Sequence, residues 1–424
     1  MNMNRVKFIH AADLHLDTPF RGLSSWNADL AKRLRDATFR SYRRIIDLCL
    51  QHRVDFLVIS GDIFDSEMQS LAAQLGFVSG LKRLSENGIA TYFICGNHDP
   101  LGSWLEGLQM PENVFRFGSG EVETLGFNRD GALLAAITGI SYQDREVNEN
   151  LAGRYRITDS RAPVSIALLH GSVGPTGPHR NYAPFRVRDV EKKGFDYWAL
   201  GHLHQRQVVQ AANPAIAYPG NPQGRDFGET GPKGCLLVEI EEKRPPAIRF
   251  LETHSIRFEE VVLDLAGEER IDRIPQLIND AITGIESYDA QSSYIIRVII
   301  RGRTSLHPVL NRPGEMQQLA DQFNEGQIHR SKFTLIDRIE LQTRPDIDLE
   351  KLRNAEDFTA EILQCVEEYE ADEAKLGTLI GSVEEDFVSH GAKREIGDLT
   401  EDEKKGVLER VRWLLLDQLI TESK

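Results

Sequence analysis

Residues 6–15 read Val6-Lys7-Phe8-Ile9-His10-Ala11-Ala12-Asp13-Leu14-His15. The run 6–12 is apolar enough to predict a short strand, and two side chains that bind metals, Asp13 and His15, follow it directly. Side chains two apart in an extended segment point to the same face, so these two are expected to point the same way. Polar residues just past a strand end mark the usual position of a site on an open α/β sheet.

The same arrangement recurs at four later places. Apolar runs are followed by Gly61-Asp62, Gly96-Asn97-His98-Asp99, a single His170 and Gly201-His202-Leu203-His204. Taken singly, a G-N-H-D segment can be a turn, and an H-x-H segment is usually structural or exposed. Together, in this order and all at expected strand ends, they predict one site assembled from several loops.

These residue types form the ligand set of a two-metal phosphoesterase. Two cations about 3.5–4 Å apart acidify a bound water and clamp the oxygens of a phosphate ester. Asp62 is the candidate carboxylate that bridges them. The ligands expected at one ion are Asp13, His15 and His204, and those expected at the other are Asn97, His170 and His202. Mixed nitrogen and oxygen ligands suit Mn²⁺, Fe²⁺ or Zn²⁺ better than Ca²⁺.

His98 follows a predicted ligand directly and cannot easily bind the same ion, so we assign it to the substrate side. As an imidazolium it could stabilise the transition state or protonate the leaving oxygen. Asp99 is expected to orient it, as carboxylates often orient working histidines. Six other histidines are interpreted as surface or packing residues: His10, His52, His254, His307, His329 and His390.

Strand and helix patterns alternate over residues 1–255 and predict a layered α/β domain. The expected strands are 6–12, 55–60, 90–95, 132–140, 164–169 and 197–200. Helical spacing covers 30–48, and a second helix carries Leu71, Leu75, Val78 and Leu81 in register. Later strands, including 234–240, come without long helices between them. We therefore expect a second, partly antiparallel sheet packed on the first.

Two further parts are expected beyond residue 255. Residues 256–345 show strand, helix, strand, helix and strand patterns, which predicts a small α/β domain. Residues 346–424 are predicted to be helical, with Phe358, Ile362, Val366 and Tyr369 on one face. Thr400 and Glu403 form a capping-box pattern before the last helix. The expected core face of that helix is Val407, Val411, Leu414 and Leu415, whereas Trp413, Leu416 and Ile420 are expected to point elsewhere.

The net charge of −15 is confined to one part of the chain. Residues 1–255 contain 29 Lys and Arg and 29 Asp and Glu, so the whole acidic excess lies in residues 256–424. The global charge therefore says little against a DNA substrate, because two cations would make the first part positive. The four cysteines are far apart and form no C-x-x-C pair, which predicts small buried residues in a reducing cytoplasm. No apolar run is long enough to predict a membrane span.

The quoted motifs resemble those of calcineurin-like metallophosphoesterases. The segments 10–17 and 60–65, Gly96–Pro100, Gly201–His204 and 219–225 are similar to those of SbcD-type DNA repair exonucleases, especially their YhaO-like branch. The resemblance covers residues 5–255 well. It implies a two-sheet αββα metallophosphoesterase sandwich, followed by a small α/β capping domain and C-terminal helices that bind a partner.

The same resemblance implies Mn²⁺-dependent exonucleolytic cleavage of DNA at duplex ends, together with an SbcC-type or YhaN-like coiled-coil ATPase. A homodimer is a further possibility. Three loop arginines, Arg21, Arg180 and Arg225, are candidates for DNA contacts, because arginine neutralises phosphate. Two alternatives stay open: a small-molecule phosphodiesterase or nucleotidase that uses the same site, and a non-catalytic subunit that holds an ATPase or a DNA end. The long C-terminal part argues against the first, and the intact ligand set argues against the second.

Overall fold

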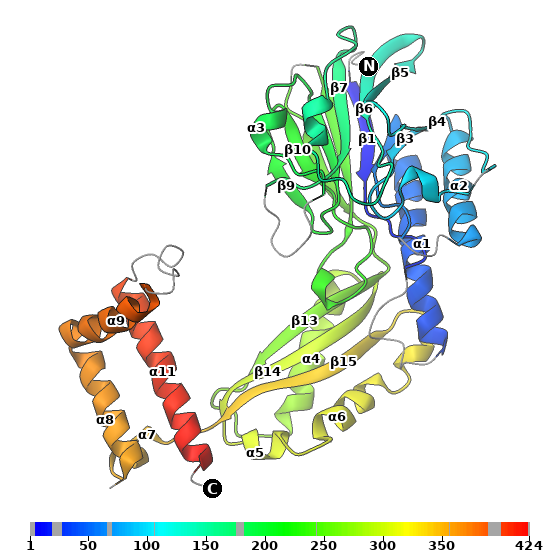
Figure 1. Cartoon of the computed structure of the whole chain (residues 1–424). Coiled ribbons are helices and arrows are strands. Elements are labelled where there is room, and N and C mark those ends of the chain that lie inside the picture. The colour runs from blue at the N-terminus through cyan, green and yellow to red at the C-terminus, as the bar shows by residue number, and fades with distance from the viewer. Residues whose placement is uncertain are drawn as a thin grey trace. The chain divides into compact units, whose positions relative to one another are not determined.

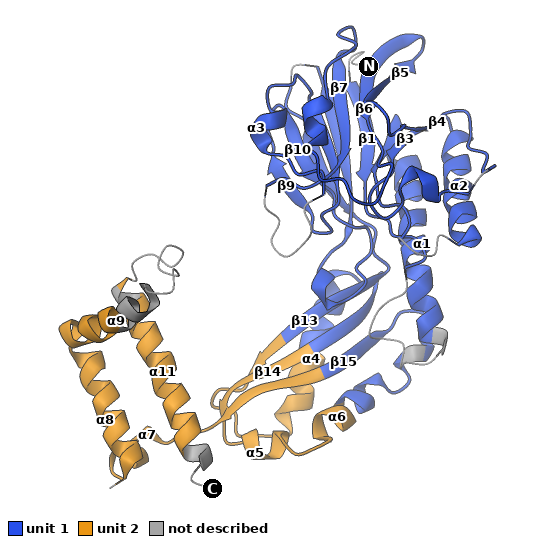
Figure 2. Ribbon diagram, in the orientation of Figure 1, with its two compact units in different colours: residues 1–261, 281–297, 320–338 blue, residues 262–280, 298–319, 339–424 orange. Residues whose placement is uncertain are grey.

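The computed structural model describes residues 5–18, 28–65, 70–105, 107–174, 182–242, 244–355, 357–388 and 400–422. The chain divides into two compact units (Figure 2). Unit 1 comprises residues 1–261, 281–297 and 320–338, and unit 2 the remainder. The boundaries that we predicted at residues 255 and 345 stay predictions. Within the described ranges, no helix has the length and apolar character needed to cross a membrane.

The first sheet of unit 1 has the order β12-β11-β1-β2-β3-β4. The parallel strands are β1 (Arg5–Ala11), β2 (Phe56–Ser60), β3 (Ala90–Ile94) and β4 (Val114–Arg116). β11 (Gly234–Glu241) pairs antiparallel with β1, and β12 (Ala247–Glu252) pairs antiparallel with β11. We had expected 234–240 in the second sheet, and this was wrong. β11 is apolar on both faces, Leu237 on one and Val238 on the other, so it needs a position covered on both sides.

The second sheet has the order β5-β6-β7-β8-β10-β9. Its central strands are parallel: β6 (Ala132–Gly139), β7 (Val164–His170), β8 (Tyr197–Gly201) and β10 (Ala215–Tyr218). The edge strands β5 (Glu123–Arg129) and β9 (Gln207–Gln210) are antiparallel to their neighbours. The expectation of a partly antiparallel second sheet is therefore confirmed.

Helices cover the outer faces of both sheets (Figure 1). Tyr42 of α1 (Ala28–His52) and Phe77 of α2 (Leu71–Ser85) pack in one apolar core with Ile59 of the first sheet. A second core between the sheets joins side chains such as Val58 and Ile166. On the far side, Trp198 packs with η2 (Leu151–Arg154) and α3 (Val187–Val190). The predicted αββα sandwich is thus confirmed.

The predicted β-α-β-α-β segment is also present. It forms a sheet of order β13-β14-β15, made of β13 (Ile256–Asp264), β14 (Ser293–Thr304) and β15 (Thr334–Pro345). The connections contain α4 (Arg273–Tyr288), α5 (His307–Leu310), α6 (Glu315–Asn324) and η4 (Gln327–His329). Within unit 1, Leu34 of α1 packs with Phe258 and Phe333.

Unit 2 ends in α7 (Leu349–Arg353), α8 (Phe358–Ala371), α9 (Glu373–Val388) and α11 (Glu401–Glu422). The capping box is confirmed, since Thr400 N–H donates to the Glu403 carboxylate and Glu403 N–H donates to the Thr400 hydroxyl. The face that we predicted for α8 is confirmed in part, because Val366 is buried and Tyr369 packs against its cluster, whereas Phe358 is exposed. The face that we predicted for α11 was wrong.

In α11 the buried apolar residues are Leu408 and Leu416, whereas Val411 and Leu414 are exposed. The Trp413 ring lies 3.9 Å from the Arg303 guanidinium, so its partner lies within this chain. One cysteine also differs from expectation: Cys49, Cys95 and Cys235 are buried, but Cys365 is exposed.

Candidate metal centre

The predicted ligands all lie in unit 1, at or just beyond the carboxyl ends of five parallel strands. Asp13 follows β1, Asp62 follows β2 and Asn97 follows β3 in the first sheet. His170 is the last residue of β7, and His202 follows β8, in the second sheet. A pocket of about 730 Å³ opens here, and its lining includes Asp62, Asn97, His98, His202 and His204. Packing two parallel-rich sheets face to face is therefore what brings the distant motifs together.

The potential ligand atoms at this pocket fall into three groups, each within 4.8 Å. Asp13, His15 and His204 form the first, Asp62, His170 and His202 the second, and His15, Asp65 and His98 the third. In the first, His15 Nε2 lies 3.0 Å from His204 Nε2. In the second, His170 Nε2 lies 2.9 Å from Asn97 Oδ1 and 3.3 Å from Asp62 Oδ2. The first two groups contain the ligands expected from the sequence, and the third was not expected.

Asp62 Oδ2 is also 3.9 Å from His15 Nε2 in the first group. This carboxylate therefore lies between the first two groups, where a bridging ligand belongs. That these residues bind ions stays a prediction.

The burial of these side chains fits a pair of divalent cations. The carboxylate of Asp62 outweighs burial and raises the pKa of His170 to about 9, so a bound ion would have to displace a proton from that imidazole. Burial lowers the pKa of His202 to about 3 and holds that of His15 well below its usual range, which leaves both imidazoles neutral, as ligands must be. His15 Nδ1 and His202 Nε2 are buried and have no hydrogen-bond partner among the described residues. Asp13 and Asp62 are buried as well, and buried carboxylates are costly unless a cation offsets their charge.

Several predicted ligands have strained backbone conformations, with positive φ angles. Asp13, Asp62 and His202 have positive φ angles of 52°, 52° and 103°. Left-handed conformations of this kind cost roughly 1–3 kcal/mol each and persist only where the surrounding structure imposes them. Glycine precedes Asp62 because Gly61 has φ 88° and a Cβ there would lie 2.6 Å from His170 Nδ1. Gly96 precedes Asn97 because a Cβ would collide with the Asp62 carboxylate.

Asp99 does not orient His98, contrary to our expectation. Its buried carboxylate accepts hydrogen bonds from the backbone N–H groups of Gly96, Asp62 and Ile63, at 2.7, 3.1 and 3.0 Å. The turn that carries G-N-H-D points this side chain back into the two loops. Asp99 therefore fixes the position of Asp62 rather than the ring of His98.

Asp65 takes the place expected for Asp99. The ring nitrogen Nδ1 of His98 lies 2.9 Å from Asp65 Oδ1. The backbone N–H of His98 donates to Asp62 Oδ1 at 2.9 Å. Burial alone would lower the pKa of His98, but the hydrogen bond to Asp65 and the charge of Asp62 outweigh it and raise that pKa. His98 lines the pocket with its ring held at one nitrogen, which leaves Nε2 as the atom able to reach a substrate.

Glu229 is a site residue that the sequence did not reveal. It ends the short helix η3 (Phe227–Glu229), and its Oε1 lies 2.6 Å from His204 Nδ1. Arg225 Nη2 donates to the same oxygen at 2.8 Å, and Asn221 donates to Oε2 at 2.8 Å. Together they fix the ring of His204. The signal that could have pointed to it is the spacing of four between Arg225 and Glu229, typical of an ion pair.

The three candidate DNA contacts have different outcomes. Arg225 lines the pocket, but its guanidinium is engaged with Glu229 and lies 3.0 Å from His204 Nδ1. Arg21 and Arg180 lie outside the described residues. Tyr182, two residues after Arg180 in the sequence, lines the pocket with its ring centroid 5.2 Å from that of His202.

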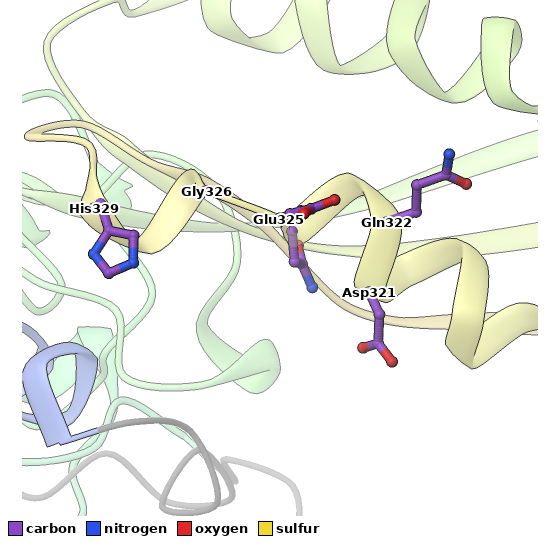
Figure 3. A pocket seen from close by; sticks show the side chains of 6 residues that line it. Asp321, Gln322, Glu325, Gly326 and His329 are labelled. Carbon is purple, nitrogen blue, oxygen red and sulfur yellow. The ribbon is translucent and has the colours of Figure 1, made fainter.

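A second hollow, of about 510 Å³, lies beside α6 and contains none of the predicted site residues (Figure 3). The side chains of Asp321 and Gln322 point in different directions there. Asn324, which also lines it, is engaged by its amide with the backbone of Ile336. The hollow thus lacks the convergence of ligand atoms seen at the strand ends.

Comparison with known proteins gives two family matches. Residues 6–206 match the family described as calcineurin-like phosphoesterase. Residues 258–344 match the middle domain of metallophosphoesterase YhaO. The two matched segments contain the site loops and the three-stranded sheet, respectively.

Similarity to individual proteins extends over nearly the whole chain. This chain is 34% identical to the "Uncharacterized metallophosphoesterase YhaO" of Bacillus subtilis (strain 168), over 98% of both chains. It is 27% identical to the "DNA double-strand break repair protein Mre11" of Haloferax volcanii, over 71% of this chain and 62% of that protein. The protein of the same name from Saccharolobus solfataricus is 24% identical over 87% of this chain and 96% of its own length.

Proposed function

The chain belongs to the calcineurin-like metallophosphoesterases, in the group of YhaO, and from this premise we propose that it is a metal-dependent exonuclease acting on DNA ends. The observation that carries the choice of DNA is the similarity to double-strand break repair proteins named Mre11, which reaches 87% of this chain. A match of that extent includes residues beyond the catalytic sandwich. A small phosphate ester would need no such additional parts.

The pocket holds the groups that phosphodiester hydrolysis requires. When bound, a pair of divalent cations supplies a more acidic water and neutralises charge on the phosphoryl oxygens. Asp13, His15, Asp62 and His204 would hold one of them, and Asp62, Asn97, His170 and His202 the other. The mixed nitrogen and oxygen donors support Mn²⁺, with Fe²⁺ and Zn²⁺ as alternatives.

His98 is the residue that we assign to the substrate. Its Nδ1 is held by Asp65, so Nε2 would donate a proton to the oxygen of the leaving nucleotide. The hydrogen bond to Asp65 and the nearby carboxylates favour the imidazolium that this step needs. Glu229 and Asp99 position other groups, the first by holding His204 and the second by holding the loop of Asp62.

We also propose two partners in the cytoplasm: a coiled-coil ATPase of the SbcC or YhaN type, and a second copy of this chain. Exposed apolar residues support both proposals. Val411 and Leu414 on α11 offer a surface for the first, and Leu71, Leu75 and Leu105 in unit 1 offer one for the second.

The test is cleavage of linear duplex DNA labelled at either end, with Mn²⁺, Zn²⁺ or EDTA, with and without the candidate ATPase. We expect Mn²⁺-dependent shortening from the ends. Bis-p-nitrophenyl phosphate and cyclic nucleotides serve as small substrates in parallel. Turnover of the small esters without DNA cleavage, even with the ATPase present, would support the alternative small-molecule phosphodiesterase and reject the nuclease.

The matched control is His98→Ala in the same preparations. This variant should retain its metal content and lose cleavage of DNA and of the small ester together. A contaminating nuclease would leave the DNA products unchanged in the variant.

A further inference from the structure

A second cluster of potential ligands lies away from the catalytic pocket. Glu252 is the last residue of β12, His254 lies in the link from β12 to β13, and Asp289 follows α4. All three belong to unit 1, and their ligand atoms lie within 4.8 Å of one another. His254 Nε2 is 3.3 Å from Asp289 Oδ2 and 3.8 Å from Glu252 Oε2. Two carboxylates therefore face one imidazole nitrogen.

The ring of His254 is buried, and its side chain is only 1% exposed. Its Nε2 is one of the buried side-chain atoms that have no hydrogen-bond partner among the described residues. Neither carboxylate completes a hydrogen bond to Nε2: Glu252 Oε2 is too distant at 3.8 Å, and Asp289 Oδ2 at 3.3 Å does not meet its angular requirement. A histidine that we first interpreted as a packing residue thus directs a buried nitrogen at two acids.

The other nitrogen of His254 has two backbone neighbours. Nδ1 lies 3.1 Å from the Lys233 carbonyl oxygen, to which it can donate, and 3.3 Å from the Lys233 backbone nitrogen, from which it can accept. The shorter contact favours the tautomer with the proton on Nδ1. In that tautomer Nε2 presents a lone pair to two negative groups, which is repulsive unless a cation lies between them. The carboxylate of Asp289 is also oriented toward such a cation. Its Oδ1 accepts a hydrogen bond from the Gln291 N–H at 2.8 Å, and its Oδ2 faces His254.

We propose that Glu252, His254 and Asp289 form a third cation site, for a divalent transition-metal ion, with Zn²⁺ as the best match. Zinc bonds of about 2.0–2.2 Å to nitrogen and oxygen place tetrahedral ligands roughly 3.3 Å apart or somewhat more. The measured separations of 3.3 and 3.8 Å agree with this. The Glu252 side chain is 34% exposed, so the site opens to solvent and a water can fill the fourth position.

Two arginines lie near the cluster, and both have other partners. Arg257 pairs with Glu259, and Arg44 donates to the carbonyl oxygen of His254 rather than to its ring. The first arginine's charge is thus offset locally. The second one holds the backbone of the link, and its charge adds to the hydrogen bonds from Ser292 and Gln291 that outweigh burial and lower the pKa of Asp289.

The position of the site indicates a structural role. An ion here ties the link that leaves β12 to the turn that follows α4. It also acts on the catalytic loop through Lys233, whose backbone contacts His254 Nδ1 and whose Nζ donates to the His204 carbonyl oxygen at 3.0 Å. The inference needs no assumption about the substrate of the enzyme, because it concerns metal content and stability alone.

The test is the number of Zn²⁺ ions retained by the full chain after loading and desalting, measured by plasma mass spectrometry. We expect three ions in the wild type and two in Asp289→Asn and in Glu252→Gln. Glu260→Gln, a carboxylate of similar exposure on β13 that pairs with Arg297, is the control and should keep three. An equal Zn²⁺ count in the wild type and Asp289→Asn would overturn the site, whether or not either protein cleaves DNA.

A second measurement separates a metal ligand from a simple hydrogen bond. The melting temperatures of wild type and Asp289→Asn should be similar in EDTA and should diverge when Zn²⁺ is added. The same decrease in EDTA and in Zn²⁺ would mean that Asp289 merely bonds to His254, and would overturn the proposal. Anomalous scattering from Zn²⁺-soaked wild-type crystals should show a peak at His254 Nε2, and its absence beside filled catalytic sites would count equally against it.

Discussion

The site loops bury their carboxylates, whereas the C-terminal helices keep theirs at the surface in ion pairs. In the loops, Asp13 and Asp62 are buried among imidazoles, and the backbone bends into left-handed conformations to bring them there. In the helices, acids pair with bases at the surface, as Glu373 does with Lys405. We therefore expect the buried carboxylates of the loops to need bound cations, whereas the surface ion pairs of the helices need none. Substitutions in the two regions should differ accordingly in whether their effects depend on metal.

The largest effect is expected at Asp62, the carboxylate between the two ligand groups. Asp62→Asn should lower the rate of phosphodiester cleavage by more than about 10³-fold, because metal activation contributes several kcal/mol. The same variant should melt at a lower temperature than the wild type in EDTA, because without ions His170 and the neighbouring histidines outweigh burial and lower the pKa of Asp62, and His170 would lose this charged partner. Metal analysis and thermal melts with Mn²⁺ or EDTA check both statements. A variant that still holds two ions would remove Asp62 from the bridging position.

A smaller effect is expected at His98, which we assign to the substrate and not to the ligand set of an ion. His98→Ala should lower the rate by about 10²–10⁴-fold and leave the metal count unchanged. Asp65→Asn should lower it by about 10–100-fold, because it only orients the ring. Steady-state rates and metal content in the two variants check the order. Loss of an ion from His98→Ala would move this residue into the ligand set.

The contrast between Asp65 and Asp99 shows where the sequence stopped being informative. The ligand motifs can be recognised in the sequence because ligand chemistry requires particular side chains after particular strands, and the order of the motifs along the chain predicts the two groups. The direction of a side chain inside a left-handed turn is set by backbone angles that residue spacing does not encode. Two acids near His98 were therefore indistinguishable, and the structure places the nearer one in sequence on the backbone of Asp62.

The predicted core face of α11 was wrong for another reason. In α11, apolar residues occur on several sides, so the pattern defines no single face. Leu414 and Leu416 are equally apolar, yet the first is 59% exposed and the second is fully buried. What selects Leu416 is the contact of its neighbours with Arg303 and Glu370, which lie far away in the sequence. Strands buried on both faces, such as β2 and β3, had no such ambiguity and were predicted closely.

An intermediate effect is expected at Glu229, which holds His204 from outside the ligand set. Glu229→Gln should weaken metal binding at the group of Asp13, His15 and His204 by about 10–100-fold, as loss of an outer-sphere partner does. Activity should return when Mn²⁺ is raised, which distinguishes a positioning residue from a catalytic one. Titration of activity with Mn²⁺ checks this. A rate that stays low at saturating Mn²⁺ would give Glu229 a role in the chemistry itself.

The smallest effect is expected at Asp417 on α11. It tests whether the stability of the helices is independent of metal. Asp417 Oδ1 accepts from both Arg303 Nη1 and Nη2 at 3.1 Å, and its partly buried carboxylate also lies 3.4 Å from Arg344. Asp417→Asn should destabilise the helical region by about 1 kcal/mol, because a half-buried ion pair contributes little more than an exposed one. Hydrogen exchange of α11 checks this, with Glu373→Gln as an exposed control that should leave exchange unchanged. The decrease should be the same in Mn²⁺ and in EDTA; a difference would mean that the metal centre and the C-terminal helices are coupled, and that the separation drawn between them does not hold.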